Sequence, residues 1–172
     1  SYIADIKFGY TSDTCDDEGE KTFVNEPKFS KEELICTLEN FKGKIEQMPP
    51  KYSAIKVDGK KLCGLARQNK PMPQIKPRQV EIFEIKLLKF NNKDEAQIFV
   101  HCSKGTYIRS IVRDLGQKLG CGAYMSELVR TQAGNFKIEN SQKISPEIKN
   151  YALNPIDVLD FRKINLNEQE YK

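Results

Sequence analysis

Apolar and polar residues recur with regular periods along most of this 172-residue chain. Residues 2–10 carry an apolar or aromatic side chain at every second position, which is the period of a β-strand. Residues 80–90 and 95–102 also have the character of strands, and the Asn- and Asp-containing residues 91–94 between them predict a hairpin. Strands therefore account for much of the pattern, and two of them are expected to pair antiparallel.

Two other segments have the period of a helix. Ser30–Glu33 is a capping box, in which the first and last residues can each bond the other's backbone, and it predicts a helix start. One side of that helix would carry three apolar residues: Leu34, Ile35 and Leu38. Residues 108–119 carry apolar side chains at spacings of 3, 4, 7 and 11, and Gly120 then supplies a stop signal.

The remaining segments are less periodic. Residues 11–20 are rich in Asp, Ser, Thr and Gly and predict a polar loop. Residues 49–77 are basic and contain several prolines, which predicts a long excursion rather than a packed layer; such loops usually serve as lids or binding loops. Residues 124–138 fit a strand or a helix–strand mixture, and the residues from 145 suggest a short helix. The whole pattern predicts an α+β fold with a mixed, mainly antiparallel sheet and flanking helices.

Composition narrows the class of protein. Hydrophobic residues at 38% and charged residues at 30% are typical of a soluble protein. No apolar run approaches the roughly 18–20 residues of a membrane helix, and the first residues do not resemble a signal peptide. The five cysteines are scattered and His101 is the only histidine. We therefore predict free thiols, a reducing cytoplasm and no metal site.

The charges are unevenly distributed. Residues 1–40 hold ten Asp or Glu against four Lys or Arg, whereas residues 42–78 hold ten Lys or Arg against two acidic residues. A local excess of positive charge can mark the contact surface for a polyanion such as a nucleic acid, or it can be a solvated face. Charge alone leaves both interpretations open.

Several common catalytic motifs are missing from the chain. It has no P-loop, no dinucleotide-binding glycine motif, no nucleophile elbow and no zinc-protease motif. Ser103–Thr106 superficially resembles the end of a phosphate-binding loop, but it lacks the glycine five residues earlier. Because the chain has a single histidine, we expect Asp, Glu, Tyr or Lys to serve as any general acid or base.

Two stretches are specific enough to indicate a family. Residues 101–110, continued by 114–116 and 119–120, closely resemble the strand–turn–helix motif of TruB-type pseudouridine synthases. Residues 49–62, together with Ala66 and Arg67, look like the RNA-gripping loop of the bacterial form. Shorter matches occur at Tyr2, at residues 11–17 with Gly19, and at residues 128–131 with Gly134 and Phe136.

The resemblance implies a domain organisation. Residues 1–160 would be the C-terminal part of the synthase catalytic domain, with 49–78 as the RNA-gripping loop, and 161–172 would start a truncated C-terminal module. The family's G-x-L-D-x-x-A-x-G segment, whose aspartate attacks the uridine, has no counterpart among the nine aspartates here. We therefore expect this chain to begin after that segment and to be inactive by itself.

The resemblance also implies an activity and site residues. The family isomerises the T-loop uridine (uridine-55) of tRNA to pseudouridine with no cofactor. Arg109 is similar to the arginine that pairs with the nucleophilic carboxylate, and Tyr2 to the tyrosine that stacks on the target base. Tyr107 resembles a second pocket tyrosine. Leu128 would form an apolar wall of the base site, although a place in the core is an equally good interpretation.

The resemblance implies that RNA is the partner. The T-arm stem-loop of tRNA would bind a monomeric protein, and five basic residues would neutralise its phosphates: Lys51, Lys56, Lys60, Lys61 and Arg67. Two alternatives remain open at this point. The chain could be a non-catalytic RNA-binding module of the same fold, or a structural domain with a solvated basic face.

Overall fold

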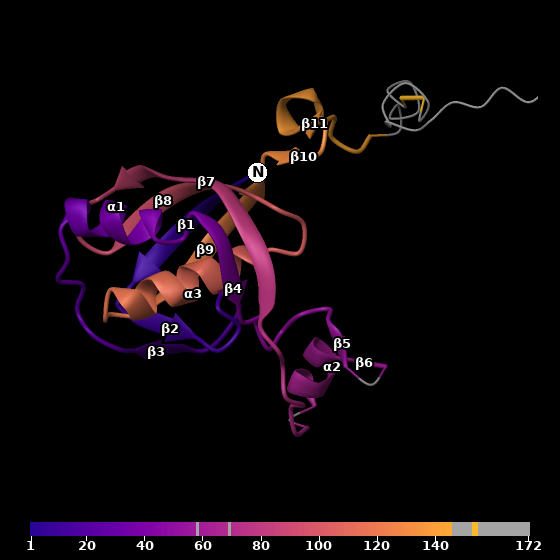
Figure 1. The fold of residues 1–172 in the computed structure, drawn as a ribbon, viewed down its shortest axis with the longest axis horizontal. Coiled ribbons are helices and arrows are strands. Elements are labelled where there is room, and N and C mark those ends of the chain that lie inside the picture. Colours follow the sequence, from indigo (N-terminus) through magenta and orange to yellow (C-terminus); the bar gives the residue numbers. More distant parts are fainter. Residues whose placement is uncertain (58, 69, 146–152, 155–172) are drawn as a thin grey trace, which may run out of the picture. The chain divides into compact units, whose positions relative to one another are not determined.

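A five-stranded sheet forms the centre of the computed structural model and follows from the alternating sequences (Figure 1). Its strands, in spatial order, are β4 (Gly43–Gln47), β7 (Arg78–Phe90), β8 (Glu95–Cys102), β1 (Tyr2–Phe8) and β9 (Ala123–Arg130). Every neighbouring pair is antiparallel. The predicted β7–β8 hairpin and the mainly antiparallel α+β fold are thus confirmed, whereas β4 was not predicted.

The structure describes residues 1–57, 59–68, 70–145 and 153–154, and the side chain of Lys60 lies outside the description. The chain divides into two units, Ser1–Thr131 and Gln132–Lys172. The sheet and both long helices belong to the first unit. The predicted domain boundary at residue 160 lies outside the described residues.

The first predicted strand is interrupted. β1 ends at Phe8, and after Gly9 a separate strand β2 (Tyr10–Ser12) pairs with β3 (Lys21–Phe23). Gly9 has a φ of +94°, a conformation that side-chain-bearing residues rarely adopt, so the chain turns out of the sheet there. The prediction of one strand through residue 10 was therefore wrong, because alternation alone does not reveal a backbone turn.

Two helices cover one face of the sheet. α1 (Lys31–Glu39) begins with the predicted capping box, in which Glu33 N–H donates to Ser30 Oγ at 3.1 Å and Ser30 N–H donates to the Glu33 carboxylate at 2.7 Å. α3 (Ile108–Lys118) buries its predicted apolar stripe against β1 and β9. Ile35 was predicted to lie on the same side as Leu34 and Leu38, but it is 42% exposed whereas they are buried. Leu34 and Leu38, four residues apart, face inward and turn Ile35 aside.

One apolar core lies between this sheet face and the two helices. On β1, the buried residues are Ala4, Ile6 and Phe8, as the alternation predicted. Asp5 and Lys7 point to the other face, where Gln97 donates to Asp5 at 2.9 Å and Lys7 pairs with a glutamate of β8. The sheet therefore has one dry face and one polar face, and α3 lies on the dry face.

The basic excursion contains folded elements. It includes the short strands β5 (Lys56–Val57) and β6 (Lys60–Lys61), which pair with each other, and α2 (Leu62–Arg67). Leu62 is fully buried and Ile55 is nearly so, although neither belongs to the main core. The segment is thus an excursion rather than a packed layer, as predicted, and two apolar residues that are separated in the sequence form a local nucleus within it.

The residues after β9 form a small hairpin. β10 (Gln132–Ala133) pairs with β11 (Phe136–Lys137), and a short 3₁₀ helix follows at Ile138–Asn140. The ambiguous segment 124–138 is thus mainly strand. The helix expected from residue 145 falls almost entirely on residues outside the description. Among the residues that the structure describes, no helix has the length and apolar character needed to cross a membrane.

Candidate active site

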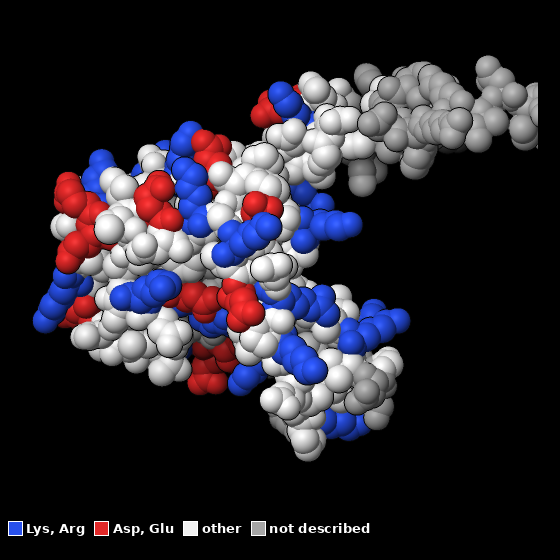
Figure 2. Space-filling model, in the orientation of Figure 1, with Lys and Arg blue, Asp and Glu red and all other residues white. Residues whose placement is uncertain are grey.

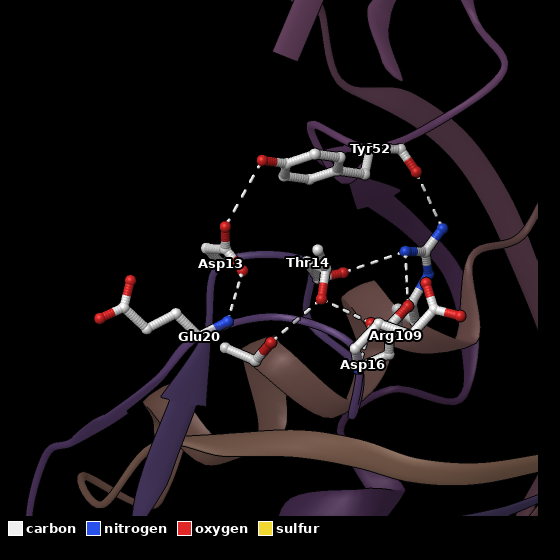
Figure 3. A network of polar contacts seen from close by, with 8 residues as sticks. Asp13, Thr14, Asp16, Glu20, Tyr52 and Arg109 are labelled. Carbon is white, nitrogen blue, oxygen red and sulfur yellow. Dashed lines mark hydrogen bonds and ion pairs between the residues drawn. The ribbon is translucent and has the colours of Figure 1, made fainter. Parts of the chain in front are cut away.

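Arg109 lies in the first turn of α3 and is held by three acceptors (Figure 3). Its Nη1 donates to Asp16 Oδ2 at 2.8 Å and to the backbone oxygen of Thr14 at 3.0 Å. Its Nη2 donates to the backbone oxygen of Tyr52 at 2.9 Å. The side chains of Arg109 and Asp16 are only 23% and 20% exposed, so this ion pair is partly shielded from water. Arg109 is therefore fixed in position before any ligand binds.

The loop after β2 supplies the carboxylate. Asp16 forms a bridge to Met125 of β9, and Met125 N–H donates to the backbone oxygen of Cys15 at 3.2 Å. Cys15 has a φ of 64°, an unusual value for a residue with a side chain. The Thr14 hydroxyl donates to Asp16 Oδ1 at 2.5 Å, so Asp16 is fixed on both oxygens. The polar loop that the composition predicted is thus a rigid support for Arg109.

The thiol beside this carboxylate is not poised as a nucleophile. Cys15 is 7% exposed, and burial raises the pKa of its thiol, against the opposing pull of Arg113 and Arg109. A raised pKa keeps the thiol protonated near neutral pH, and the protonated form is unreactive. The chemistry of the site must therefore come from other groups.

The root of the basic excursion is bonded to the start of α3. Tyr107, the residue that precedes the helix, has its backbone N–H and its carbonyl bonded to the side chain of Gln47, at 2.8 and 3.1 Å. The backbone oxygen of Met48 accepts from Ser110 Oγ at 2.9 Å and from Arg113 Nη2 at 3.0 Å. The excursion therefore leaves the sheet beside Arg109.

Two further predicted site residues lie on the neighbouring strands. Tyr2 pairs with Arg130 and Ala4 pairs with Leu128, so Tyr2 and Leu128 share the sheet face that α3 covers. Tyr2 is partly buried against the core, whereas Leu128 is 42% exposed. Leu128 is therefore not a core residue, which removes one of its two interpretations. No bond joins either residue to Arg109 within the described part of the chain.

The predicted RNA-contact residues lie on the excursion. Four of them have exposed side chains: Lys51, Lys56, Lys61 and Arg67. The side chain of Lys60, the fifth, lies outside the description. On the face shown in Figure 2, Lys and Arg side chains lie at the excursion, while the neighbouring part of the molecule carries acidic and basic side chains together. The described residues also contain no cluster of His, Cys, Asp and Glu suited to a metal ion.

Comparison with known proteins identifies the family of this chain. A family model described as TruB family pseudouridylate synthase (N terminal domain) matches residues 1–108. The chain belongs to the TruB family. A second model, described as tRNA pseudouridylate synthase B C-terminal domain, matches residues 109–150, so the junction between the two matches falls at Arg109. The family resemblance predicted from the sequence is confirmed.

Curated relatives of this TruB-family chain are roughly twice as long. A tRNA pseudouridine synthase B from Francisella philomiragia is 47% identical over 142 residues, which cover 81% of this chain and 46% of the relative. A protein of the same name from Clostridioides difficile strain 630 is 43% identical over 143 residues, covering 82% of this chain and 47% of the relative. The chain therefore spans about half the length of the curated relatives it matches.

Solved structures show the same fold. A chain in the crystal structure of a Cbf5-Nop10-Gar1 complex matches with a TM-score of 0.55 and 27% identity, over 81% of this chain and 32% of that chain. A chain in the structure of an H/ACA RNP bound to a substrate RNA containing 2'-deoxyuridine matches with a TM-score of 0.50 and 24% identity, over 81% and 30%. The second likeness concerns the fold alone.

Two residues of the site were missed by sequence reasoning. Asp16 lies within a stretch that resembles the family, but no role was predicted for it. Gln47 gave no signal, because a single glutamine before a proline pair has no characteristic pattern. Both act on residues more than fifty positions away, at α3.

Proposed function

We propose that this chain forms the arginine-bearing part of the active site of a tRNA pseudouridine synthase, which isomerises the T-loop uridine (uridine-55) of tRNA to pseudouridine. The observation that carries the proposal is the fixed guanidinium of Arg109, at the position where the TruB resemblance expects the partner of the nucleophilic carboxylate. Family membership supports the reaction class.

The guanidinium has donors to spare for a second carboxylate. An arginine side chain carries five N–H donors, and three of those of Arg109 go to Thr14, Asp16 and Tyr52, which leaves two. Those two, Nε–H and one N–H of Nη2, have no partner among the described residues. Two donors on one planar group can hold a carboxylate in a single orientation and favour its ionised form. That is the form of the family's aspartate that attacks the uridine.

The other predicted residues would handle the RNA. The target base must leave its stack, and Tyr2, Tyr107 and Leu128 would offer aromatic and apolar surface to it. The exposed Lys and Arg residues of the excursion would neutralise phosphates. We further propose that the protein acts as a cytoplasmic monomer on the T-arm stem-loop, without metal or cofactor.

The test replaces Arg109 with lysine in a chain that also carries the family's G-x-L-D-x-x-A-x-G segment. Lysine keeps the charge but loses the planar two-pronged geometry, so the carboxylate would adopt unproductive positions. A misplacement of about 1 Å can cost on the order of a hundredfold in rate. We expect single-turnover pseudouridylation of T-arm RNA to fall by about that factor, while filter binding at fixed salt changes little.

Arg113→Lys is the matched control, because Arg113 lies one turn further along α3 and bonds to Met48 and Asp114 instead of Asp16. This variant should keep most of the single-turnover rate. An unchanged rate in Arg109→Lys would remove Arg109 from the catalytic residues. Equal losses of rate and binding would make it a phosphate contact, as in a non-catalytic RNA-binding module.

A further inference from the structure

α3 begins without a local cap. Helices usually begin with a side chain that bonds the free backbone N–H groups of the first turn, but Tyr107, the residue at this position, makes no such bond. Gln47, at the end of β4, instead bonds the backbone of Tyr107 itself. Its Oε1 accepts from Tyr107 N–H at 2.8 Å and its Nε2 donates to Tyr107 O at 3.1 Å. The side-chain amide of Gln47 thus bonds both backbone groups of Tyr107, as a residue of a neighbouring β-strand would.

Because Gln47 is buried, the loss of either bond to Tyr107 would leave a polar group without a partner. Gln47 is 2% exposed, so neither end of its amide can exchange its bond for one with water. Tyr107 precedes Arg109 by two residues, and the backbone of Tyr107 sets where the first turn of α3 starts. A shift of Tyr107 therefore moves the origin of the Arg109 side chain.

The same short segment contacts α3 repeatedly. After Gln47 bonds Tyr107, the backbone oxygen of Met48 accepts from Ser110, and that of Tyr52 accepts from Arg109. Residues 47–52, which include the start of the basic excursion, thus run along the first turn of α3. One of the three bonds of Arg109, the one to the backbone oxygen of Tyr52, joins its side chain directly to this segment.

We propose that Gln47 is a positioning residue for Arg109: its amide fixes Tyr107 and thereby joins the root of the excursion to the guanidinium. The catalytic consequence of this role rests on the proposed function. The positioning itself does not, because it concerns contacts within this chain. If Gln47 were important only for stability, its substitution would lower the stability of the whole fold and would leave Arg109 in place.

The first measurement uses this chain alone. Gln47→Met keeps the length of the side chain and removes both bonds to Tyr107. We expect the Arg109 Nε–Hε resonance, assigned from its loss in Arg109→Lys, to shift or broaden. Gln97→Met makes the same chemical change on β8, where Gln97 bonds Asp5 on the polar face, and it should leave that resonance unchanged.

The second measurement uses a chain that also carries the family's aspartate segment. We expect Gln47→Met to lower the single-turnover rate on T-arm RNA by about tenfold to a hundredfold. The RNA dissociation constant should change less than threefold, because the exposed basic residues of the excursion are retained. Gln97→Met should match the wild type in both quantities. If Gln47→Met does not fold, the same measurements are made on Gln47→Glu. This variant keeps an acceptor for Tyr107 N–H and loses the donor to Tyr107 O.

The outcomes separate the two proposals. An unchanged Arg109 resonance in the Gln47 variant overturns the positioning role, and so does an equal shift in Gln97→Met, which would indicate general loosening. A shifted resonance with an unchanged rate supports the positioning role and counts against the catalytic role proposed for Arg109. A shifted resonance, a lower rate and unchanged binding support both.

Discussion

Asp16 accepts three of the polar contacts of the site. One of its oxygens accepts from the Thr14 hydroxyl and from Glu18 N–H, and the other accepts from Arg109. A partly shielded carboxylate with this many donors contributes more than an exposed ion pair does. Its contribution should therefore be measurable in this chain without any RNA.

The substitution Asp16→Asn tests this contribution. Asparagine turns one carboxylate oxygen into an N–H₂ group, which cannot accept from the guanidinium and leaves Arg109 without its charged partner. We expect a loss of about 1–3 kcal/mol in the free energy of unfolding by urea. Asp17→Asn is the control, because the exposed Asp17 has Lys21 as its only ion-pair partner among the described residues, and it should change stability by less than about 0.5 kcal/mol. Equal losses in the two variants would contradict this role of Asp16.

The buried thiols give the chain a dependence on alkaline pH. Burial raises the pKa of Cys15 above its ordinary value of 9.0, and it does the same for Cys102 and Cys121. The folded chain then binds these protons more tightly than the unfolded chain. This stabilisation is complete below about pH 9 and declines as the pH rises through the folded-state values. We expect the urea midpoint to fall as the pH rises above about 9.

In Cys15→Ala, the urea midpoint should fall less steeply with rising pH, because the substitution removes one of the buried thiols that titrate. Cys36→Ala removes an exposed thiol and should leave the slope as it is. Urea titrations at several pH values, followed by circular dichroism, give the comparison. A decline of equal steepness in Cys15→Ala and the wild type would show that the buried thiol of Cys15 is not its source.

At the scale of elements, the basic excursion has a small apolar nucleus that is separate from the main core. Its buried Leu62 and Ile55 are joined by a backbone bond, in which Leu62 N–H donates to the Ile55 oxygen at 2.9 Å, and neither residue belongs to the main core. Because this nucleus is small, we expect residues 49–78 to be the least ordered long segment in the absence of RNA.

Leu62→Ala should therefore unfold the excursion locally. Removing a buried leucine side chain costs about 2–5 kcal/mol, which is more than so small a nucleus can lose. We expect amide hydrogen exchange to accelerate throughout residues 49–78, while amides of β7 and β8 keep their protection. Leu38→Ala, in the main core, should instead lower the protection of the sheet. Loss of sheet protection in Leu62→Ala would show that the excursion and the sheet unfold as one unit.

At the scale of the whole molecule, activity should need more than this chain. The chain positions an arginine but has no aspartate in the family's nucleophile context, and positioning without an attacking carboxylate gives no route to glycosidic cleavage. We expect no tritium release from uridine-labelled tRNA transcript with the 172-residue chain. A chain that also carries the family's aspartate segment is the positive control. Release above the blank by this chain alone would show that one of its own residues replaces the aspartate.

Local interactions explain what the sequence determined by itself. The capping box, the stripe of α3 and the β7–β8 hairpin depend on residues within a few positions of one another, and all three are confirmed. The family resemblance and the role proposed for Arg109 also came from contiguous residues. The failures, at Gly9 and Ile35, occurred where a backbone turn or the choice between neighbouring helix positions decided the outcome.

Only the tertiary structure decided which residues complete the site. Asp16 meets Arg109 across 93 positions, and Gln47 meets Tyr107 across 60. Such meetings depend on strand order, on register and on the angle at which α3 crosses the sheet. No periodicity in the chain encodes them, because each is a consequence of many distant contacts acting together. The sequence therefore indicates the arginine, whereas the fold selects the carboxylate and the amide that hold it.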